Sequence, residues 1–195
     1  MGNKPQLVLD VAGVLIANMS PVFWQQLSAD SGISYEKLLV HFKKNVRKSL
    51  WTGSITEGDF WNWLGSTFPT VNLHHARNFL ESSLKPLTAM NHVARWSEIA
   101  DIHLLSNHRT EWLRTPLAPI INYISTATIS SDVGFCKPHR EIYDVVAKKL
   151  SIEQSVFFVD DQEKNLRRAI EFGWNTLHAD ELGLWISHVE RLLLS

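Results

Sequence analysis

The spacing of apolar residues along this chain changes near residue 100. Before that point, beyond the first few residues, apolar side chains recur every three or four positions, which is typical of helices with one buried face. After it, short runs of consecutive apolar residues alternate with amphipathic segments, and a run of the same kind, QLVLDV, already stands at 6–11. Apolar strands that alternate with helices predict an α/β protein with a Rossmann-like parallel sheet.

The predicted strands share a short apolar core bounded by polar or turn-forming residues. They are 6–11, 102–107, 123–130, 155–161 and, as a fifth, 175–179. The helices expected in this part of the chain are 109–121, 139–150, 165–173 and 182–194. The second half of the sequence therefore predicts a regular succession of strands and helices.

The first hundred residues carry several signals of helix ends. Ser20 followed by Pro21 predicts an N-cap with proline at the first helical position, and Gly32 predicts a C-cap. Thr56 and Asp59 have the spacing of a capping box. The helices expected here are 21–32, 34–53, 55–68, 72–84 and 87–100.

This helical block interrupts the crossover that should follow the first strand. We therefore expect residues 18–85 to form a helical cap inserted after that strand. Residues 1–17 and 86–195 would together form the Rossmann-like core. We expect the tryptophans of the cap to build its apolar interior rather than a ligand platform: Trp51, Trp61 and Trp63.

The composition limits the classes of function that this protein can have. Of its 195 residues, 45% are hydrophobic and 20% are charged, which suits a globular domain with a substantial core. The formal net charge of −1 gives no reason to expect a nucleic acid or an anionic membrane as partner. Cys136 is the one cysteine, so no internal disulfide can form, and no run approaches the ~20 apolar residues of a membrane span. We expect a soluble cytoplasmic protein, and the sequence leaves its oligomeric state open.

Polar side chains stand at the ends of three predicted strands. Asp10 follows the first, Ser106 and Asn107 close the second along the chain, and Asp160 and Asp161 close the fourth. Ligands of open parallel sheets bind at the carboxyl ends of the strands, so these groups are expected at one edge. A single polar strand end is ordinary loop chemistry, whereas three together predict a site.

The same residues lie in segments that resemble a known family. The stretches LDVAGVL, LLSN, GFCKPHREIY and FFVDDQEKN resemble, in this order and spacing, the four motifs of the haloacid-dehalogenase-like (HAD) hydrolases, most of which are Mg²⁺-dependent phosphatases. The helical block, including GSITEGDFW, is similar to the small cap of the subgroup that contains the phosphatase domain of soluble epoxide hydrolase and the bacterial glucose-1-phosphatases. The resemblance covers essentially the whole chain.

The resemblance implies a role for each matching residue. Asp10 would attack phosphorus and form an aspartyl-phosphate, and Lys137 would neutralise phosphate charge and hold Asp10. Mg²⁺ would be held by Asp10, Asp161 and the backbone carbonyl of Ala12. The substrate would be a small phosphorylated metabolite.

Four further residues have supporting roles by the same resemblance. Ser106 and Asn107 would donate hydrogen bonds to the phosphoryl oxygens. Asp160 would be a partner behind the metal ligands, and Asn165 would support the site.

The chain departs from the family pattern at position 12. Typical members have an aspartate two residues after the nucleophile, which protonates the leaving group and later activates water, and Ala12 can do neither. Loss of such acid–base help typically costs ~10²–10⁴ in rate, so a handicapped phosphatase is the main hypothesis. A non-catalytic phosphate- or partner-binding protein and a 2-haloacid dehalogenase are the alternatives. Dehalogenases also lack this acid but need no metal, which would leave the acids at 160–161 unexplained.

Overall fold

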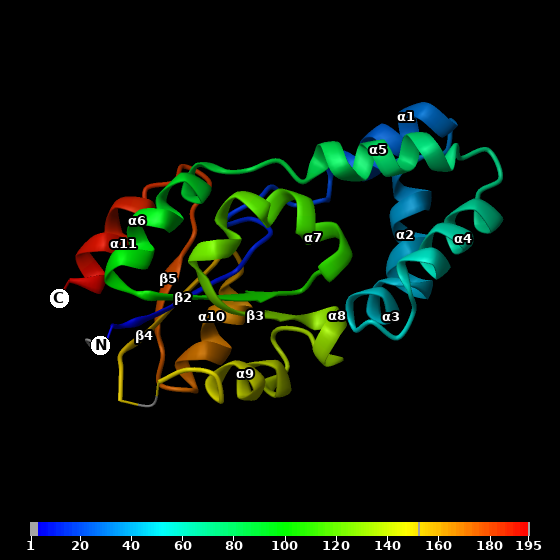
Figure 1. Cartoon of the computed structure of the whole chain (residues 1–195). Helices are drawn as coiled ribbons and strands as arrows, with labels where there is room; N and C mark the ends of the chain where they lie inside the picture. The colour runs from blue at the N-terminus through cyan, green and yellow to red at the C-terminus, as the bar shows by residue number, and fades with distance from the viewer. Residues whose placement is uncertain (1–3, 152, 195) are drawn as a thin grey trace.

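The fold centres on one parallel sheet, as the sequence predicts. The computed structural model describes residues 4–151 and 153–194. Its five strands are ordered β3-β2-β1-β4-β5, and every neighbouring pair is parallel (Figure 1). The strands are β1 (Gln6–Leu9), β2 (Asp101–Ser106), β3 (Ile124–Ile129), β4 (Val156–Asp160) and β5 (Asn175–His178). The first strand therefore lies in the middle of the sheet.

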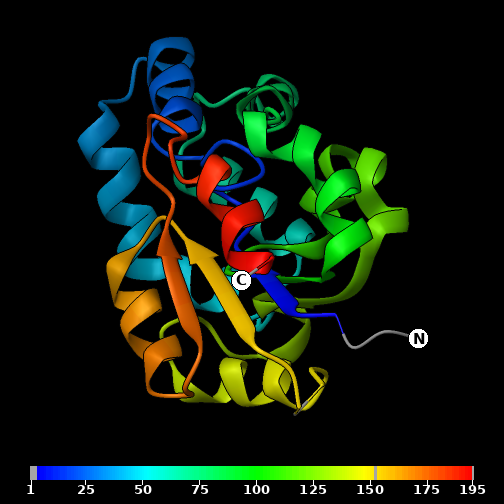
Figure 2. The same ribbon diagram turned by 90° about the vertical axis from the view of Figure 1, so that its left-hand side faces the viewer.

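Both faces of the sheet are buried because side chains alternate along each strand. Leu7 and Leu9 of β1 join one hydrophobic cluster, whereas Val8 joins a second cluster on the opposite face. Figure 2 shows the two helical layers on either side of the sheet. The helices that pack into the first cluster are α6 (Val93–Ile99), α7 (Thr110–Leu117) and α11 (Ile186–Leu193), and those of the second are α9 (Arg140–Ala147) and α10 (Glu163–Ile170).

Between β1 and β2 the chain forms the helical insertion, which lies to the right in Figure 1. Its helices are α1 (Val22–Ser31), α2 (Tyr35–Asn45), α3 (Arg47–Trp51), α4 (Glu57–Thr67) and α5 (Leu73–Ser83). The segment that leads into the insertion and the one that leads out of it run side by side. The Ala17 amide donates to the Lys85 carbonyl at 2.7 Å, and the Leu87 amide donates to the Leu15 carbonyl at 2.8 Å. The insertion and one face of the sheet share a single hydrophobic cluster.

Two of the predicted helix caps are confirmed and one is wrong. The Thr56–Asp59 capping box forms, and Gly32 ends α1 with a φ of 72° as a C-cap should. The Ser20 N-cap was wrong, because α1 begins at Val22 and its N-cap residue, Pro21, offers no side-chain acceptor. The capping box and the C-cap glycine were therefore predicted correctly, whereas the Ser-Pro pair did not mark the N-cap.

Two long predicted helices are divided in the structure. The one expected at 34–53 breaks at Val46, whose φ of −130° is not helical, so that α2 and α3 can both bury apolar residues in the same cluster. The one expected at 109–121 continues beyond α7 as a 3₁₀ helix, Ala118–Tyr123, because Pro119 has no amide hydrogen for a further α-helical bond. Similarly, the segment expected at 87–100 starts as a 3₁₀ helix, Thr88–His92.

The strand expected at 123–130 ends one residue early, where a short helix, α8 (Ser130–Val133), begins. The core segments expected at 1–17 and 86–195 include residues 1–3, 152 and 195, which lie outside the described residues. Within the described ranges, no helix has the length and apolar character needed to cross a membrane.

A buried arginine holds the helical insertion against the sheet layers. The Nη1 atom of Arg109 donates to the carbonyls of Ile55 at 2.6 Å and Leu50 at 3.3 Å, and its Nη2 donates to Glu111 at 2.6 Å. Gly53 lies nearby with a φ of +70°, and a Cβ at this position would stand 2.0 Å from the Ser131 carbonyl oxygen. The close approach of insertion and core at this point therefore requires glycine.

We predict that Gly53→Ala lowers the free energy of unfolding by about 2–5 kcal/mol, since it combines left-handed strain with a backbone clash. The matched control is Gly134→Ala, because Gly134 has a φ of +82° but nothing within 4 Å of an added Cβ. The control should lose only the strain, about 1–2 kcal/mol. Urea unfolding of both variants measures the difference, and equal losses would mean that the contact with Ser131 does not matter.

Candidate active site

A buried lysine joins two of the predicted site acids at the carboxyl edge of the sheet. The Nζ atom of Lys137 lies 2.8 Å from Oδ1 of Asp10 and 2.6 Å from Oδ2 of Asp160. Asp10 directly follows β1, Asp160 is the last residue of β4, and Lys137 comes from the loop between α8 and α9. All three side chains are almost fully buried. The strand ends therefore do converge, and a cation from a separate loop holds them together.

The two adjacent acids at the end of β4 have different surroundings. Both oxygens of Asp160 accept hydrogen bonds, from the Asn165 side chain at 2.9 and 3.0 Å and from the Gln162 amide at 2.8 Å. Oδ1 of Asp161 is buried and has no hydrogen-bond partner, while its Oδ2 accepts from Asn18 at 3.2 Å. Asp160 is thus fully engaged as a support, and Asp161 keeps an oxygen available for a ligand.

The loop after β1 passes close to the Asp161 side chain. Gly13 has a φ of +91°, and a Cβ there would lie 2.3 Å from Oδ2 of Asp161 and 2.9 Å from Nδ2 of Asn18. The peptide between Ala12 and Gly13 is therefore held beside the Asp161 carboxylate, where a backbone carbonyl can share a ligand with it. The side chain of Ala12 itself offers no functional group.

The charges of this cluster do not balance. Ligand oxygens of Asp10, Asp160 and Asp161 lie within 4.8 Å of one another, with one ammonium group between them. Burial raises the pKa of the Asp10 carboxyl to about 8, although Lys137 acts to lower it. Burial would lower the pKa of Lys137, but its attraction to Asp10 and Asp160 outweighs this and raises it. An oxygen-rich site with excess negative charge and a free buried oxygen on Asp161 fits a hard divalent cation.

The two polar residues at the end of β2 have different hydrogen-bonding surroundings. The side chain of Asn107 is occupied, because its Oδ1 accepts from the Lys137 amide at 2.7 Å and its Nδ2 donates to the Lys137 carbonyl at 2.9 Å. Ser106 is fully buried and its Oγ has no partner. Asn107 thus fixes the backbone of Lys137, and Ser106 keeps a free hydroxyl for a ligand.

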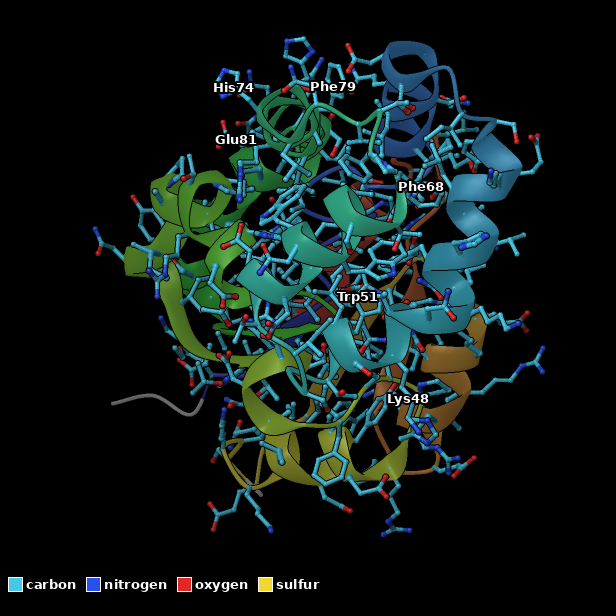
Figure 3. The ribbon with its side chains drawn as sticks, turned by 90° about the vertical axis from the view of Figure 1, so that its right-hand side faces the viewer. Lys48, Trp51, Phe68, His74, Phe79 and Glu81 are labelled. Atoms are coloured by element: carbon cyan, nitrogen blue, oxygen red, sulfur yellow. The ribbon has the colours of Figure 1, made fainter. Side chains whose placement is uncertain are left out.

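A hollow of about 660 Å³, the active-site cleft, lies between this sheet edge and the helical insertion. From the sheet side it is lined by Ala12, Asn107, His108, Lys137, Asp161 and Lys164, and from the insertion by Leu39, Phe42, Lys43, Arg47, Lys48 and Trp51. Figure 3 shows Trp51 near the middle of the view and Lys48 below it, whereas His74 and Phe79 lie on α5 at the top. Trp51 was expected in the interior of the cap. It does pack against Phe42 of α2, but it also contacts Trp112 of α7 and, half-buried, lines the cleft.

His108 is a buried wall of the cleft that sequence reasoning missed. Its ring lies 5.4 Å from that of Trp51, and its Nε2 has no hydrogen-bond partner. Burial lowers the pKa of His108 to about 4, so the ring is neutral near pH 7. Asn18 was also missed, since a lone asparagine in a loop carries no signal of its role.

Comparisons with known proteins identify solved structures that have the same architecture. No family model matches the chain, and no curated protein matches it. A HAD family enzyme from Bacteroides thetaiotaomicron superposes with a TM-score of 0.83 at 21% identity, over 97% of this chain and 100% of that one. A predicted HAD-like hydrolase from Porphyromonas gingivalis gives 0.80 at 19% identity and covers both chains fully. An L-2-haloacid dehalogenase from Xanthobacter autotrophicus gives 0.64 at 15% identity, over 97% of this chain and 83% of that one. These likenesses show that the chain has the HAD-like fold.

The Bacteroides enzyme has been solved with magnesium alone and with magnesium and inorganic phosphate. A variant of that enzyme, in which an aspartate is replaced by alanine, also forms the complex with magnesium and inorganic phosphate.

We predict that Asp10→Asn stabilises the metal-free protein, and more so at pH 8 than at pH 5. In the unfolded chain this carboxyl has an ordinary pKa near 4, whereas the folded value is about 8. Between these values the folded state binds more protons than the unfolded state, so parent stability falls as pH rises, by at most ~1.4 kcal/mol per pH unit. Asparagine removes this titration. Urea unfolding with chelator at both pH values tests it, with Asp144→Asn as a control at an exposed acid. An advantage that does not grow with pH would contradict the raised pKa of Asp10.

Proposed function

We propose that this chain is a Mg²⁺-dependent hydrolase of the HAD family that cleaves small phosphate monoesters through a covalent intermediate on Asp10. One observation carries the proposal: Asp10, held by Lys137, has a ligand oxygen within 4.8 Å of Asp161, whose Oδ1 is buried and has no partner, and both Lys137 and Asp161 line the cleft. The magnesium and phosphate complexes of the Bacteroides enzyme support it.

The carboxylate of Asp10 is oriented for attack. Its Oδ1 accepts from Lys137 and from the Val11 amide at 2.6 Å, and among the described residues Oδ2 has no donor. Oδ2 would form a bond to phosphorus while the bond from phosphorus to the ester oxygen breaks, and the electron pair would leave with the alkoxide or phenolate, which takes a proton from water. Water would then attack phosphorus and displace Asp10, which releases inorganic phosphate and restores the carboxylate.

The surrounding residues would lower the charge barrier to this attack. Asp10, Asp161 and the carbonyl of Ala12 would hold the Mg²⁺, which when bound offsets the repulsion between carboxylate and phosphate dianion. The Lys137 ammonium would contribute in the same direction, and the Ser106 hydroxyl would donate to a phosphoryl oxygen. Asp160 and Asn165 would keep Lys137 in place.

Dehalogenation fits the cluster less well. A halide leaves without a proton, which would suit Ala12, and one superposed structure is a dehalogenase. However, such chemistry needs no metal, and it would leave the gathered acids and the unpartnered oxygen of Asp161 without a purpose.

The decisive assay is phosphate release from a panel of phosphorylated metabolites, with Mg²⁺ and with chelator. The proposal expects release that requires Mg²⁺. Chloride or fluoride release from 2-haloacids in the presence of chelator would favour the dehalogenase instead.

We predict that Mg²⁺ raises the midpoint of thermal unfolding, with a stabilisation of about 2.7 kcal/mol at one hundred times the dissociation constant. Asp161→Asn should remove most of this shift, because it takes away a proposed ligand. Asp144→Asn, at an exposed acid on α9, should retain the shift. Differential scanning fluorimetry over a Mg²⁺ series measures all three proteins, and an equal shift in Asp161→Asn would place the ion elsewhere.

We predict that Ala12→Asp raises the turnover of alkyl phosphates by up to ~10²–10⁴, because the new carboxyl can protonate a strongly basic alkoxide. The gain in forming the phospho-enzyme should be smaller for aryl phosphates, whose phenolates leave easily. Burst and steady-state kinetics on both substrate types separate formation from breakdown of the intermediate. Asp10→Asn is the inactive control. If Ala12→Asp shows no activity while Mg²⁺ binds, the non-catalytic alternative is favoured.

A further inference from the structure

The active-site cleft contains more positive charge than the chemistry at Asp10 uses. Besides Lys137, four cationic side chains line it: Lys43, Arg47, Lys48 and Lys164. Asp161 is the single acid among the described residues that line the cleft. The chain as a whole has a formal net charge of −1, so this excess is a local feature.

The three cations of the insertion have no carboxylate partners within the described ranges. Several arginines elsewhere are paired with carboxylates, such as Arg77 with Glu57 at 3.9 Å and Arg95 with Glu190 at 2.9 Å. Lys43, Arg47 and Lys48 are exposed and form no ion pair in residues 4–151 and 153–194. Like charges gathered without counter-charges repel one another, and an anion in the cleft would relieve that repulsion.

These cations stand on the wall opposite the reacting groups. Lys137 and Asp161 belong to the sheet edge, whereas α2 and α3 supply the other wall of the cleft. On α2, Leu39, Phe42 and Lys43 are three or four positions apart and so share a face. The insertion therefore presents an apolar strip beside a cationic one.

The transferred phosphoryl group already has its own counter-charges. On the proposed function, Lys137 and the bound Mg²⁺ neutralise it at the sheet edge. If the leaving group were a neutral alcohol, it would bring no negative charge to Lys43, Arg47 and Lys48.

We infer that the leaving group of the substrate carries a second anionic group, a carboxylate or a further phosphoryl group, which Lys43, Arg47 and Lys48 bind from the helical insertion. This inference rests on the proposed function. It narrows the substrate class from phosphate monoesters in general to those with two separated negative charges.

The chain offers a matched control for this inference. Lys44 is exposed and adjacent to Lys43 on α2, but it does not line the cleft. Lys44→Gln removes the same charge from the same helix. A general effect of surface charge would change with either substitution, whereas a binding site in the cleft responds to Lys43 alone.

The experiment compares matched probes that differ in one anionic group. Glycerol 3-phosphate is set against 3-phosphoglycerate, and fructose 6-phosphate against fructose 1,6-bisphosphate. Calorimetry measures their binding to the Asp10→Asn protein with Mg²⁺, and kcat/KM is measured for the parent. In at least one pair, we expect the probe with the second anionic group to have an affinity and a kcat/KM about ten-fold higher or more. Each of Lys43→Gln, Arg47→Gln and Lys48→Gln should reduce this preference about three- to five-fold, and Lys44→Gln should leave it.

The outcomes separate this inference from the proposed function. Turnover with equal kcat/KM and affinity within both pairs overturns the inference and retains the phosphatase. Preferential binding without turnover of any probe supports the inference and counts against catalysis. A preference that Lys44→Gln reduces as much as Lys43→Gln overturns the assignment to the cleft, and failure of every probe both to bind and to be turned over by the parent protein overturns both proposals.

Discussion

The ammonium group of Lys137 is the interaction on which the candidate site depends. It stands between the buried carboxylates of Asp10 and Asp160, which would otherwise repel each other at short range. Asn107 holds the backbone of Lys137 through both its amide and its carbonyl. The ends of β1, β2 and β4 are thereby tied to one loop. A buried charge with two buried counter-charges is costly to break, so the arrangement is fixed before any ligand arrives.

The sequence predicts the position of this site better than its internal bonding. Strand ends can be found because apolar runs stop abruptly, as at Asp10 and Asp160, and the sheet brings such ends to one edge whatever the loops do. The direction of a loop side chain follows no period. The hydrogen bond between Asn107 and the backbone of Lys137 was therefore not foreseen, and the contact of Asn18 with Asp161 had no signal. Breaks in long helices, as at Val46, were missed because both halves keep helical spacing.

The helical insertion is both a covering for the site and part of the same hydrophobic interior. Arg109 anchors it through the carbonyls of Leu50 and Ile55, while the paired segments around Ala17 and Lys85 bring its two ends together. The reacting groups come from the sheet edge, and side chains of α2 and α3 line the opposite wall of the cleft. Substitutions on those two helices can therefore alter what is bound without disturbing the buried charges that would perform the chemistry.

The central place of β1 also has a consequence for how this protein is made. During synthesis, β1 leaves the ribosome well before both of its neighbours, because β2 and β4 follow it only after the helical insertion. The nascent chain must therefore carry the apolar segment QLVL unpaired until β2 has been synthesised, and with one edge still open until Val156 and its neighbours follow. Helices of the insertion can form locally during that interval, but the sheet cannot close. Synthesis of this fold thus includes a long stage in which an aggregation-prone apolar strand must be kept from other chains, whether by the insertion itself or by a chaperone.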